Sequence, residues 1–383
     1  MSETLTARVT SQLEHREYAN ETFSDQDILT LDASALWTIS PRRFTWTVED
    51  AARQVTLDPT GPDTPANRAG ANIFSTGPDL FFQLASLHTL SVAARYQNLY
   101  VGNRDIDNNA YSGAVRWLYQ LSPRTNWSVN LEQQKVDFDD DTLNEDFTRD
   151  DLYLRMDTRS GRNRFVIDGG SSRVERERSG EVNGSLARLN WTRDITADSS
   201  YGMSLARGYQ DAGLELLSSV SLSSAPLVPV AAGGVGTDVV TSDVYYSRYA
   251  DVFYTRRSGY VDFRVRARTR ELDFEETLQD RREGGGRLEL TYFYSGATTL
   301  ALFAGYLKVK YIDLARTDAD SEFGMRFGYR LTRTINFGLE GRRLERRSTD
   351  ASAEYEDNRV LMTLFYASSP IYAPMSQTPM SQR

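Results

Sequence analysis

The chain has 383 residues, a formal net charge of -9 at pH 7 and a mean hydropathy of -0.51. The acidic balance argues against binding to nucleic acid, which would favour a basic patch, and the absence of cysteine excludes disulfide bridges, thiolate metal ligands and cysteine nucleophiles. The longest mostly apolar stretch, 225–235, is too short and too rich in proline and glycine to cross a bilayer as a helix. A transmembrane β-barrel remains compatible with this hydropathy, because each of its strands shows only every second residue to lipid.

Segments in which apolar and polar residues alternate with a period of two follow each other along the chain, and helical spacing fits them poorly. The pattern predicts strands at 4–18, 26–39, 42–55, 74–87, 89–101, 109–121, 125–138, 147–159, 162–176, 182–195, 199–210, 241–255, 258–273, 283–295, 298–313, 319–332, 334–347 and 355–366. These roughly eighteen strands, with sixteen as the alternative, predict a single all-β domain over 1–367, a transmembrane antiparallel up-and-down β-barrel. Residues 368–383 are expected to form a disordered C-terminal tail.

Short polar turns flanked by aromatic residues recur along the chain. The first two are WTISPRRFTW at 37–46 and WLYQLSPRTNW at 117–127, and looser copies occupy 191–201 and 329–337. A polar reversal between two alternating segments is typical of a β-hairpin. All five tryptophans lie near such turns, which predicts an aromatic belt at the periplasmic membrane interface formed by Trp37, Trp46, Trp117, Trp127 and Trp191.

The connections between predicted strands alternate between tight and long. Arginines gather at the tight connections, whereas acidic residues gather in long ones such as 137–146. Bacterial outer-membrane barrels have short periplasmic turns and longer extracellular loops, so the alternation indicates both the fold and its orientation. The barrel pattern predicts that the protein resides in the bacterial outer membrane. Because the first residues lack an apolar signal core, we expect a signal peptide to have been removed.

The longest connection, 211–240, is unusually apolar and contains APLVPVAAGGVG. One interpretation is a mobile outer loop, which long connections often form. The other is a loop folded into the lumen as a constriction. A barrel of about eighteen strands is too wide for side chains to fill, so either form would border an aqueous channel.

Charged residues occupy the predicted inward-facing positions of several strands. The candidates for lining the lumen are Asp262, Arg264, Arg266, Arg268, Arg270, Glu132, Arg155, Glu289, Arg326 and Arg330. One interpretation is a water-filled lumen whose charges neutralise one another. The alternative is a positively biased track for an anionic or hydroxyl-rich solute, because arginine can grip carboxylates and sulfates with a fixed fork of donors.

Catalytic and metal-binding patterns are sparse. The two histidines, His15 and His88, match no nucleophile and base arrangement, and we predict no catalytic residues and no enzymatic activity. The acidic segment 137–146 lacks the glycine of an EF-hand, so no metal site or cofactor is predicted. The acidic loops are instead expected to face lipopolysaccharide, bridged to it by divalent cations.

Three segments resemble a known family. They are 37–80, beginning WTISPRRFTWTVED; 93–132, beginning AARYQNLYVGNRD; and NRVLMTLFY at 358–366. They look like a family of outer-membrane β-barrel porins associated with exopolysaccharide operons and PEP-CTERM sorting systems of Gram-negative bacteria. The resemblance implies an exopolysaccharide or oligosaccharide as solute and periplasmic export components as partners, alongside the outer-membrane lipid and lipopolysaccharide.

Two functions follow from the sequence. The first is a porin-like outer-membrane channel with a charged aqueous lumen, for polysaccharide or oligosaccharide export or uptake. The alternative is a structural or partner-binding outer-membrane barrel, closed by the 211–240 loop and anchoring a surface or periplasmic assembly.

Overall fold

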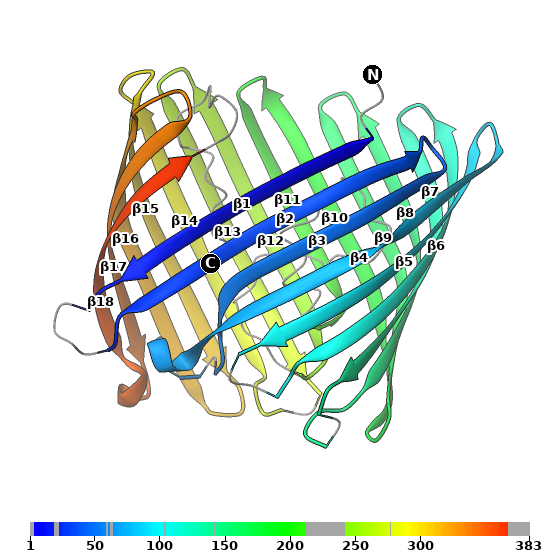
Figure 1. The fold of residues 1–383 in the computed structure, drawn as a ribbon, viewed down its shortest axis with the longest axis horizontal. Helices are drawn as coiled ribbons and strands as arrows, with labels where there is room; N and C mark the ends of the chain where they lie inside the picture. Colours follow the sequence, from blue (N-terminus) through cyan, green and yellow to red (C-terminus); the bar gives the residue numbers. More distant parts are fainter. Residues whose placement is uncertain are drawn as a thin grey trace.

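A computed structural model describes residues 4–18, 23–58, 60–61, 64–102, 105–140, 142–211, 242–275 and 277–366. These residues form one 18-stranded sheet in which each strand pairs antiparallel with the next along the chain (Figure 1). The ladders run in chain order from β1–β2 to β17–β18. The predicted all-β antiparallel up-and-down fold is confirmed.

The strands match the predicted segments in number and order. Their bounds are β1 (Leu5–Arg16), β2 (Gln26–Ser40), β3 (Phe44–Thr56), β4 (Arg68–Ala85), β5 (His88–Val101), β6 (Asn108–Ser122), β7 (Thr125–Phe138), β8 (Phe147–Ser160), β9 (Asn163–Arg176), β10 (Gly180–Thr196), β11 (Ser199–Gln210), β12 (Tyr245–Ser258), β13 (Val261–Phe274), β14 (Arg281–Phe293), β15 (Thr298–Tyr311), β16 (Arg316–Arg330), β17 (Ile335–Ser348) and β18 (Tyr355–Tyr366). Two short 3-10 helices, η1 (Pro65–Asn67) and η2 (Ala351–Ala353), interrupt the connections. No helix of the described residues is long and apolar enough to cross a membrane.

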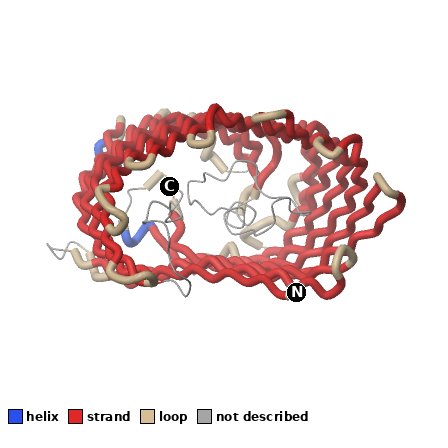
Figure 2. Tube along the Cα trace, turned by 90° about the horizontal axis from the view of Figure 1, so that it is seen from above, coloured by secondary structure: helices blue, strands red, loops and turns tan. Residues whose placement is uncertain are grey.

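Seen from above, the sheet curls into an oval ring (Figure 2). β1 and β18 are the first and last strands of this ring. Among the described residues, no ladder joins β1 to β18. Each of these two strands therefore has one edge whose backbone groups lack a partner strand.

The period-two alternation gives the sheet two different faces. On β15, Leu300, Leu302 and Tyr306 are exposed, whereas Ala301 and Phe303 between them are buried. The same pattern on the other strands makes the outer face apolar along most of its height. The buried parity faces the interior of the ring and carries most of the charged side chains of the strands.

The two ends of the ring carry different connections. One end has only short turns, at 41–43, 86–87, 123–124, 161–162, 197–198, 259–260, 294–297 and 331–334. The other end, the loop end, has the connections 17–25, 57–67, 102–107, 139–146, 177–179, 211–244, 275–280, 312–315 and 349–354. Two of these, 177–179 and 312–315, are as short as the turns, so the strict alternation in length does not hold there. Positive φ angles at Gly180 and Ala315 accompany these two tight reversals.

β4 begins earlier than the sequence predicts. Its ladder with β3 extends to Thr56 opposite Arg68, whereas the predicted strand began at 74. Gly70 and Asn72 are weak strand formers, which is why the pattern indicated a connection there. Ala69 and Ala71 are nevertheless buried on the inner face, and this burial extends the strand toward the loop end.

The inner face is apolar near the loop end of β3 to β9. One buried cluster comprises Ala51, Val55, Ala69, Ala71, Ile73, Leu99 and Val101. Leu57 and Ile106, from two different connections, pack against it. A second cluster comprises Ala110, Val136, Phe138, Phe147, Val174 and Val244. Connections of the loop end therefore fold inward over this part of the wall.

Candidate functional site

The inner face of β7 to β10 holds a compact group of charged and aromatic side chains. Arg155 of β8 makes two parallel hydrogen bonds to Asp168 of β9, at 2.7 and 2.8 Å, and Arg188 of β10 approaches the same carboxylate at 3.4 Å. Both guanidinium groups lie over the ring of Tyr153, 5.6 and 5.4 Å from its centre. The Tyr153 hydroxyl donates to Glu132 at 2.6 Å. This group is fixed by charge-assisted hydrogen bonds of favourable geometry.

The predicted arginine row lies along the inner face of β13. Arg264 pairs with Asp262 at 2.9 Å, and Arg266 pairs with Asp251 of β12 at 2.5 Å. Arg270 is buried opposite Glu283 of β14 in the ladder. Acidic residues of β13 itself and of the neighbouring strands β12 and β14 thus lie beside the arginine row.

A third group spans β14 to β17. Arg287 of β14 pairs with Glu322 of β16, across the intervening strand β15, where Gly305 lies between them in the register. Arg326 pairs with Glu340 of β17 at 2.6 Å. The guanidinium groups of Arg287 and Arg326 lie over the Phe303 ring, 4.9 and 5.7 Å from its centre.

The ten predicted lumen residues all lie on the parity opposite the exposed apolar residues. The structure brings Glu132 and Arg155 into the first group, Asp262, Arg264, Arg266, Arg268 and Arg270 into the row, and Arg326 into the third group. Glu289 faces Arg264 across the β13–β14 ladder. Arg330 joins none of these groups, because it lies at the turn end and donates to the backbone carbonyl of Gly296.

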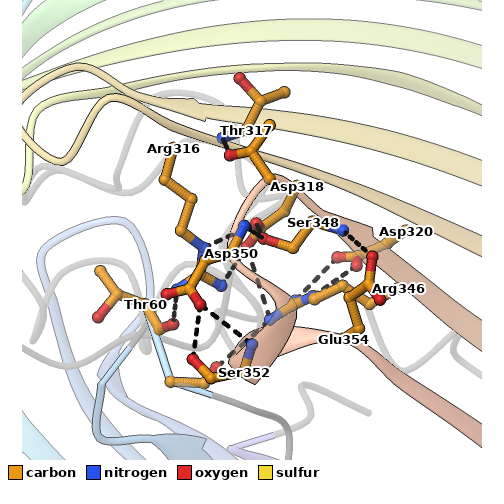
Figure 3. A network of polar contacts seen from close by, with 12 residues as sticks. Thr60, Arg316, Thr317, Asp318, Asp320, Arg346, Ser348, Asp350, Ser352 and Glu354 are labelled. Carbon is orange, nitrogen blue, oxygen red and sulfur yellow. Dashed lines mark hydrogen bonds and ion pairs between the residues drawn. The ribbon is translucent and has the colours of Figure 1, made fainter.

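A fourth group, at the loop end, was missed by the sequence analysis. Arg316 makes two hydrogen bonds to Asp318, at 2.8 and 2.6 Å, and Arg346 makes two to Asp320, at 2.6 and 2.9 Å (Figure 3). Asp318 has no exposed surface and also accepts from Ser348 at 2.6 Å. The period-two sequence RTDAD at 316–320, which places three charged residues on one face of β16, is a signal that could have identified the group.

The same two arginines also bind the 57–67 connection, which lies at the loop end but belongs to strands near the start of the sheet. Arg316 donates to the backbone carbonyl of Thr60, and Arg346 donates to that of Gly61 at 3.3 Å. The connection joins β3 to β4, while the arginines belong to β16 and β17. These contacts, called the clasp below, therefore bridge the strands β18, β1 and β2 from inside the ring.

The clasped connection is internally braced. Asp58 accepts from the backbone N–H and the hydroxyl of Thr60, at 2.8 and 2.6 Å. Asn67 accepts from the Asp58 N–H at 2.8 Å and donates to its carbonyl at 2.7 Å. A Cβ added to Gly61 would meet the Asn67 side chain at 2.8 Å, so glycine permits this close approach. The connection thus presents its carbonyl groups to the arginines in a fixed turn.

The neighbouring connection 349–354 is braced in a similar way. Asp350 caps η2 by accepting from the N–H and hydroxyl of Ser352, at 3.0 and 2.7 Å (Figure 3). These hydrogen bonds to the charged form lower the pKa of the Asp350 carboxyl. The rim beside the clasp is therefore preorganised on this side as well.

The five tryptophans lie on strands that flank the short turns. Trp37, Trp46 and Trp117 are exposed on the outer face, and Trp127 and Trp191 are partly buried on the same parity. Two of the indole N–H groups make side-chain hydrogen bonds: Trp46 donates to Thr76 at 2.8 Å, and Trp191 donates to Asn163 at 3.2 Å. This placement has the geometry of a belt, and its membrane interface stays a prediction.

The two histidines occupy the outer face. His88, the first residue of β5, stacks on Trp117 and Tyr119, with centroids 5.7 and 4.9 Å apart. His15 contacts Asp27 at 2.7 Å. Within the described residues, no group of three or more histidine, aspartate or glutamate side chains could hold a metal ion. Most of the predicted 211–240 loop, and the predicted tail at 368–383, lie outside the described residues.

Comparison with solved structures supports the fold. The FrpB iron transporter from Neisseria meningitidis (F5-1 variant) aligns with a TM-score of 0.54 and 9% identity, over 90% of this chain and 66% of that chain. The siderophore receptor PirA from Acinetobacter baumannii aligns with a TM-score of 0.53 and 9% identity, over 95% and 69%. The siderophore receptor PirA from Pseudomonas aeruginosa aligns with a TM-score of 0.50 and 12% identity, over 96% and 68%.

These likenesses show the fold of outer-membrane β-barrels, and this chain spans about two thirds of the length of the matched structures. No family model matches the chain. No curated protein matches it in sequence. The resemblance of 37–80, 93–132 and 358–366 to the exopolysaccharide-associated porins therefore stays a prediction.

Proposed function

We propose that this protein is a channel of the bacterial outer membrane, with the short turns and the tryptophan belt in the periplasm and the loop end outside. The observation that carries the proposal is the two-faced ring of 18 strands, apolar outside and lined with paired charges inside. A ring with this many strands is wider than its own side chains can fill. An aqueous passage bordered by fixed charges is the function that this arrangement supports best.

Charge pairing on the inner face favours a passage for neutral, hydroxyl-rich solutes over a bare cationic track. Arg155, Arg264, Arg266 and Arg326 each have a carboxylate partner within the wall. A paired guanidinium has fewer free donors for a solute carboxylate, but the pair still offers hydrogen bonds to hydroxyl groups. The solute class proposed from this feature and from the family resemblance is a polysaccharide or oligosaccharide, with periplasmic export components as partners.

The clasp supports a narrowing at the loop end. The 57–67 connection and the apolar clusters beneath the loops occupy part of the ring there. The 57–67 connection is distinct from the 211–240 loop, for which the sequence left a mobile outer loop and a constriction as alternatives. A channel narrowed by a braced loop selects solutes by size as well as by charge.

Planar-bilayer recording tests the proposal. The folded full chain, reconstituted from detergent, is expected to give discrete conductance steps, and linear oligosaccharides added to one side are expected to block the current. Protein that inserts, as shown by protease protection in vesicles, but gives no steps would contradict an open channel. Conductance steps that do not change when oligosaccharides are added would support the channel but contradict the proposed solute class.

The alternative is a barrel that is closed by its loops and anchors a surface or periplasmic assembly. The inward folding of the 57–67 connection favours it, because the same contacts could seal the mouth. A chain that conducts only after residues 57–67 are replaced by a short turn would support this alternative over the open channel.

A further inference from the structure

The three lysines of the chain, among 44 lysine and arginine residues, all lie on the outer face toward the loop end. Lys135 of β7 is paired with Asp137 at 2.6 Å. Lys308 and Lys310 follow each other on the exposed parity of β15, and within the described residues neither makes an ion pair or a side-chain hydrogen bond. Two uncompensated lysines on the outer face of a barrel strand call for an explanation.

The two lysines lie where the apolar outer face of β15 ends, on the side toward the loop end. From the turn end toward the loop end, the outer face of β15 presents Leu300, Leu302 and Tyr306, and then Lys308 and Lys310. A tyrosine followed by basic residues is the order found where hydrocarbon gives way to lipid head groups, since both side chain types have an apolar body and a polar tip.

The neighbouring strand β14 changes character at the same level. Its outward residues Leu290 and Leu288 give way to Gly286, Gly284 and Arg282. In the ladder Gly284 faces Lys308, and Arg282 faces Lys310. A Cβ added to Gly284 would meet no atom within 4 Å, so the surface beside Lys308 is open there.

Strand β16, on the other side, adds no acid. Ser321, Ala319 and Thr317 face Tyr306, Lys308 and Lys310 in the ladder, while Asp318 and Asp320 point to the inner face. Glu271 of β13, an outward carboxylate opposite Arg282 in the ladder, is held by Arg282 at 2.7 Å. The patch formed by Lys308, Lys310 and Arg282 therefore keeps an excess of positive charge, and the other residues that face the two lysines on β14 and β16 have small side chains or none.

We propose that Lys308, Lys310 and Arg282, with the open surface at Gly284, bind the phosphorylated head group of an outer-leaflet lipid. Alternate residues on a strand are roughly 6.6 Å apart, which lets two flexible lysine side chains reach one phosphate group. The lipid acyl chains then lie along Tyr306, Leu302 and Leu288. The site rests on the proposed orientation, with the loop end outside, but it requires no conductance, so a failed conductance test would leave it standing.

Lipid binding in detergent micelles tests the proposal. The probe is lipid A with both phosphate groups, compared with the same lipid after their removal, and bound lipid is counted by native mass spectrometry of the full chain. The unaltered protein is expected to bind the phosphorylated lipid about tenfold more tightly than the dephosphorylated lipid, as two charge-assisted contacts at a wet surface allow. The double variant Lys308→Gln with Lys310→Gln is expected to lose this preference.

Lys135→Gln is the matched control, because it removes a lysine on the same face and at the same end of the sheet, and it should leave the preference intact. Gly284→Leu is a second test that keeps every charge but fills the open surface, and it is expected to weaken binding of the phosphorylated lipid. A double variant that folds, as judged by its heat-modifiable mobility, and retains the preference would overturn the proposal. Full competition by equimolar inorganic phosphate would also overturn it, since the patch would then bind the free anion and not the lipid.

Discussion

Gly305 allows two charged residues on non-adjacent strands to meet. A Cβ at this position would lie 3.6 Å from the Glu322 carboxylate and 3.9 Å from the Arg287 guanidinium, which is ordinary contact distance. An alanine therefore fits, but a longer side chain would lie between the two charged groups. The small size of the residue at position 305 thus determines whether the β14 to β16 ion pair forms.

We expect Gly305→Leu to break the pair between Arg287 and Glu322. Separating a partly buried ion pair leaves both groups without their partner and should lower the free energy of unfolding by about 1–3 kcal/mol. The measurement is urea unfolding of the protein in lipid vesicles, followed by tryptophan fluorescence. Gly305→Ala is the control, with a change within about 0.5 kcal/mol, and an equal loss for both variants would show that strand conformation, rather than the pair, is responsible.

At the scale of elements, the clasp joins a connection to a distant part of the wall. Arg346 and Arg347 are neighbours on β17 with opposite orientations: Arg346 reaches the 57–67 connection, whereas the highly exposed Arg347 pairs with Glu345. This pair of adjacent arginines provides a matched comparison of the two faces of one strand.

Replacing Arg316 and Arg346 together by glutamine should release the 57–67 connection from the inner wall and raise the single-channel conductance. The expected increase is about 1.5-fold or more, because a released loop no longer narrows the mouth. Arg347→Gln is expected to conduct as the unaltered protein does. Asn67→Ala, which loosens the loop without touching the arginines, should act in the same direction. Unchanged conductance in both the double variant and Asn67→Ala would remove the narrowing role of the connection.

The sequence predicted the elements well because a barrel strand has a strong local signature. Alternation identified all the strands, and the polar turns flanked by tryptophans located the turn end of the ring. The start of β4 was misplaced because Gly70 and Asn72 disfavour strands locally, and a ladder with β3 overrides that preference.

The pairing of charges could be predicted only in part. Parity placed Arg266 and Arg326 on the inner face, but the choice of Asp251 and Glu340 as their partners depends on the register between strands. The clasp depends on contacts between residues more than two hundred positions apart, and no local pattern encodes the docking of Gly61 on Arg346.

At the scale of the whole molecule, the ring is held by ladders everywhere except between β1 and β18 among the described residues. Apolar side chains on these two strands are highly exposed: Val9 and Leu13 at 69% and 73%, and Val360 and Met362 at 80% and 75%. The clasp bridges these edge strands at the loop end, and no comparable described contact does so at the turn end. The seam is therefore expected to be looser at the turn end.

Hydrogen exchange of the folded protein in micelles should show this difference. Amides of β1 and β18 are expected to exchange at least about tenfold faster than those of β6 and β7, because one edge of each lacks ladder partners. Within β1, residues near Leu5 should exchange faster than those near Arg16, which lie at the clasped end. Uniform protection across all strands would indicate instead that β1 and β18 share a ladder.

The first residue of β1 and the last residue of β18 both lie at the turn end of the ring. Leu5 pairs with Trp37, near the 41–43 turn, and Tyr366 pairs with Ile335, near the 331–334 turn. A linker joining these two points, with new chain ends opened in the 139–146 connection, would preserve every strand pairing while changing the order in which the strands are synthesised. The ring therefore lends itself to circular permutation, and a permuted chain would reveal whether assembly must begin with the strands next to the seam.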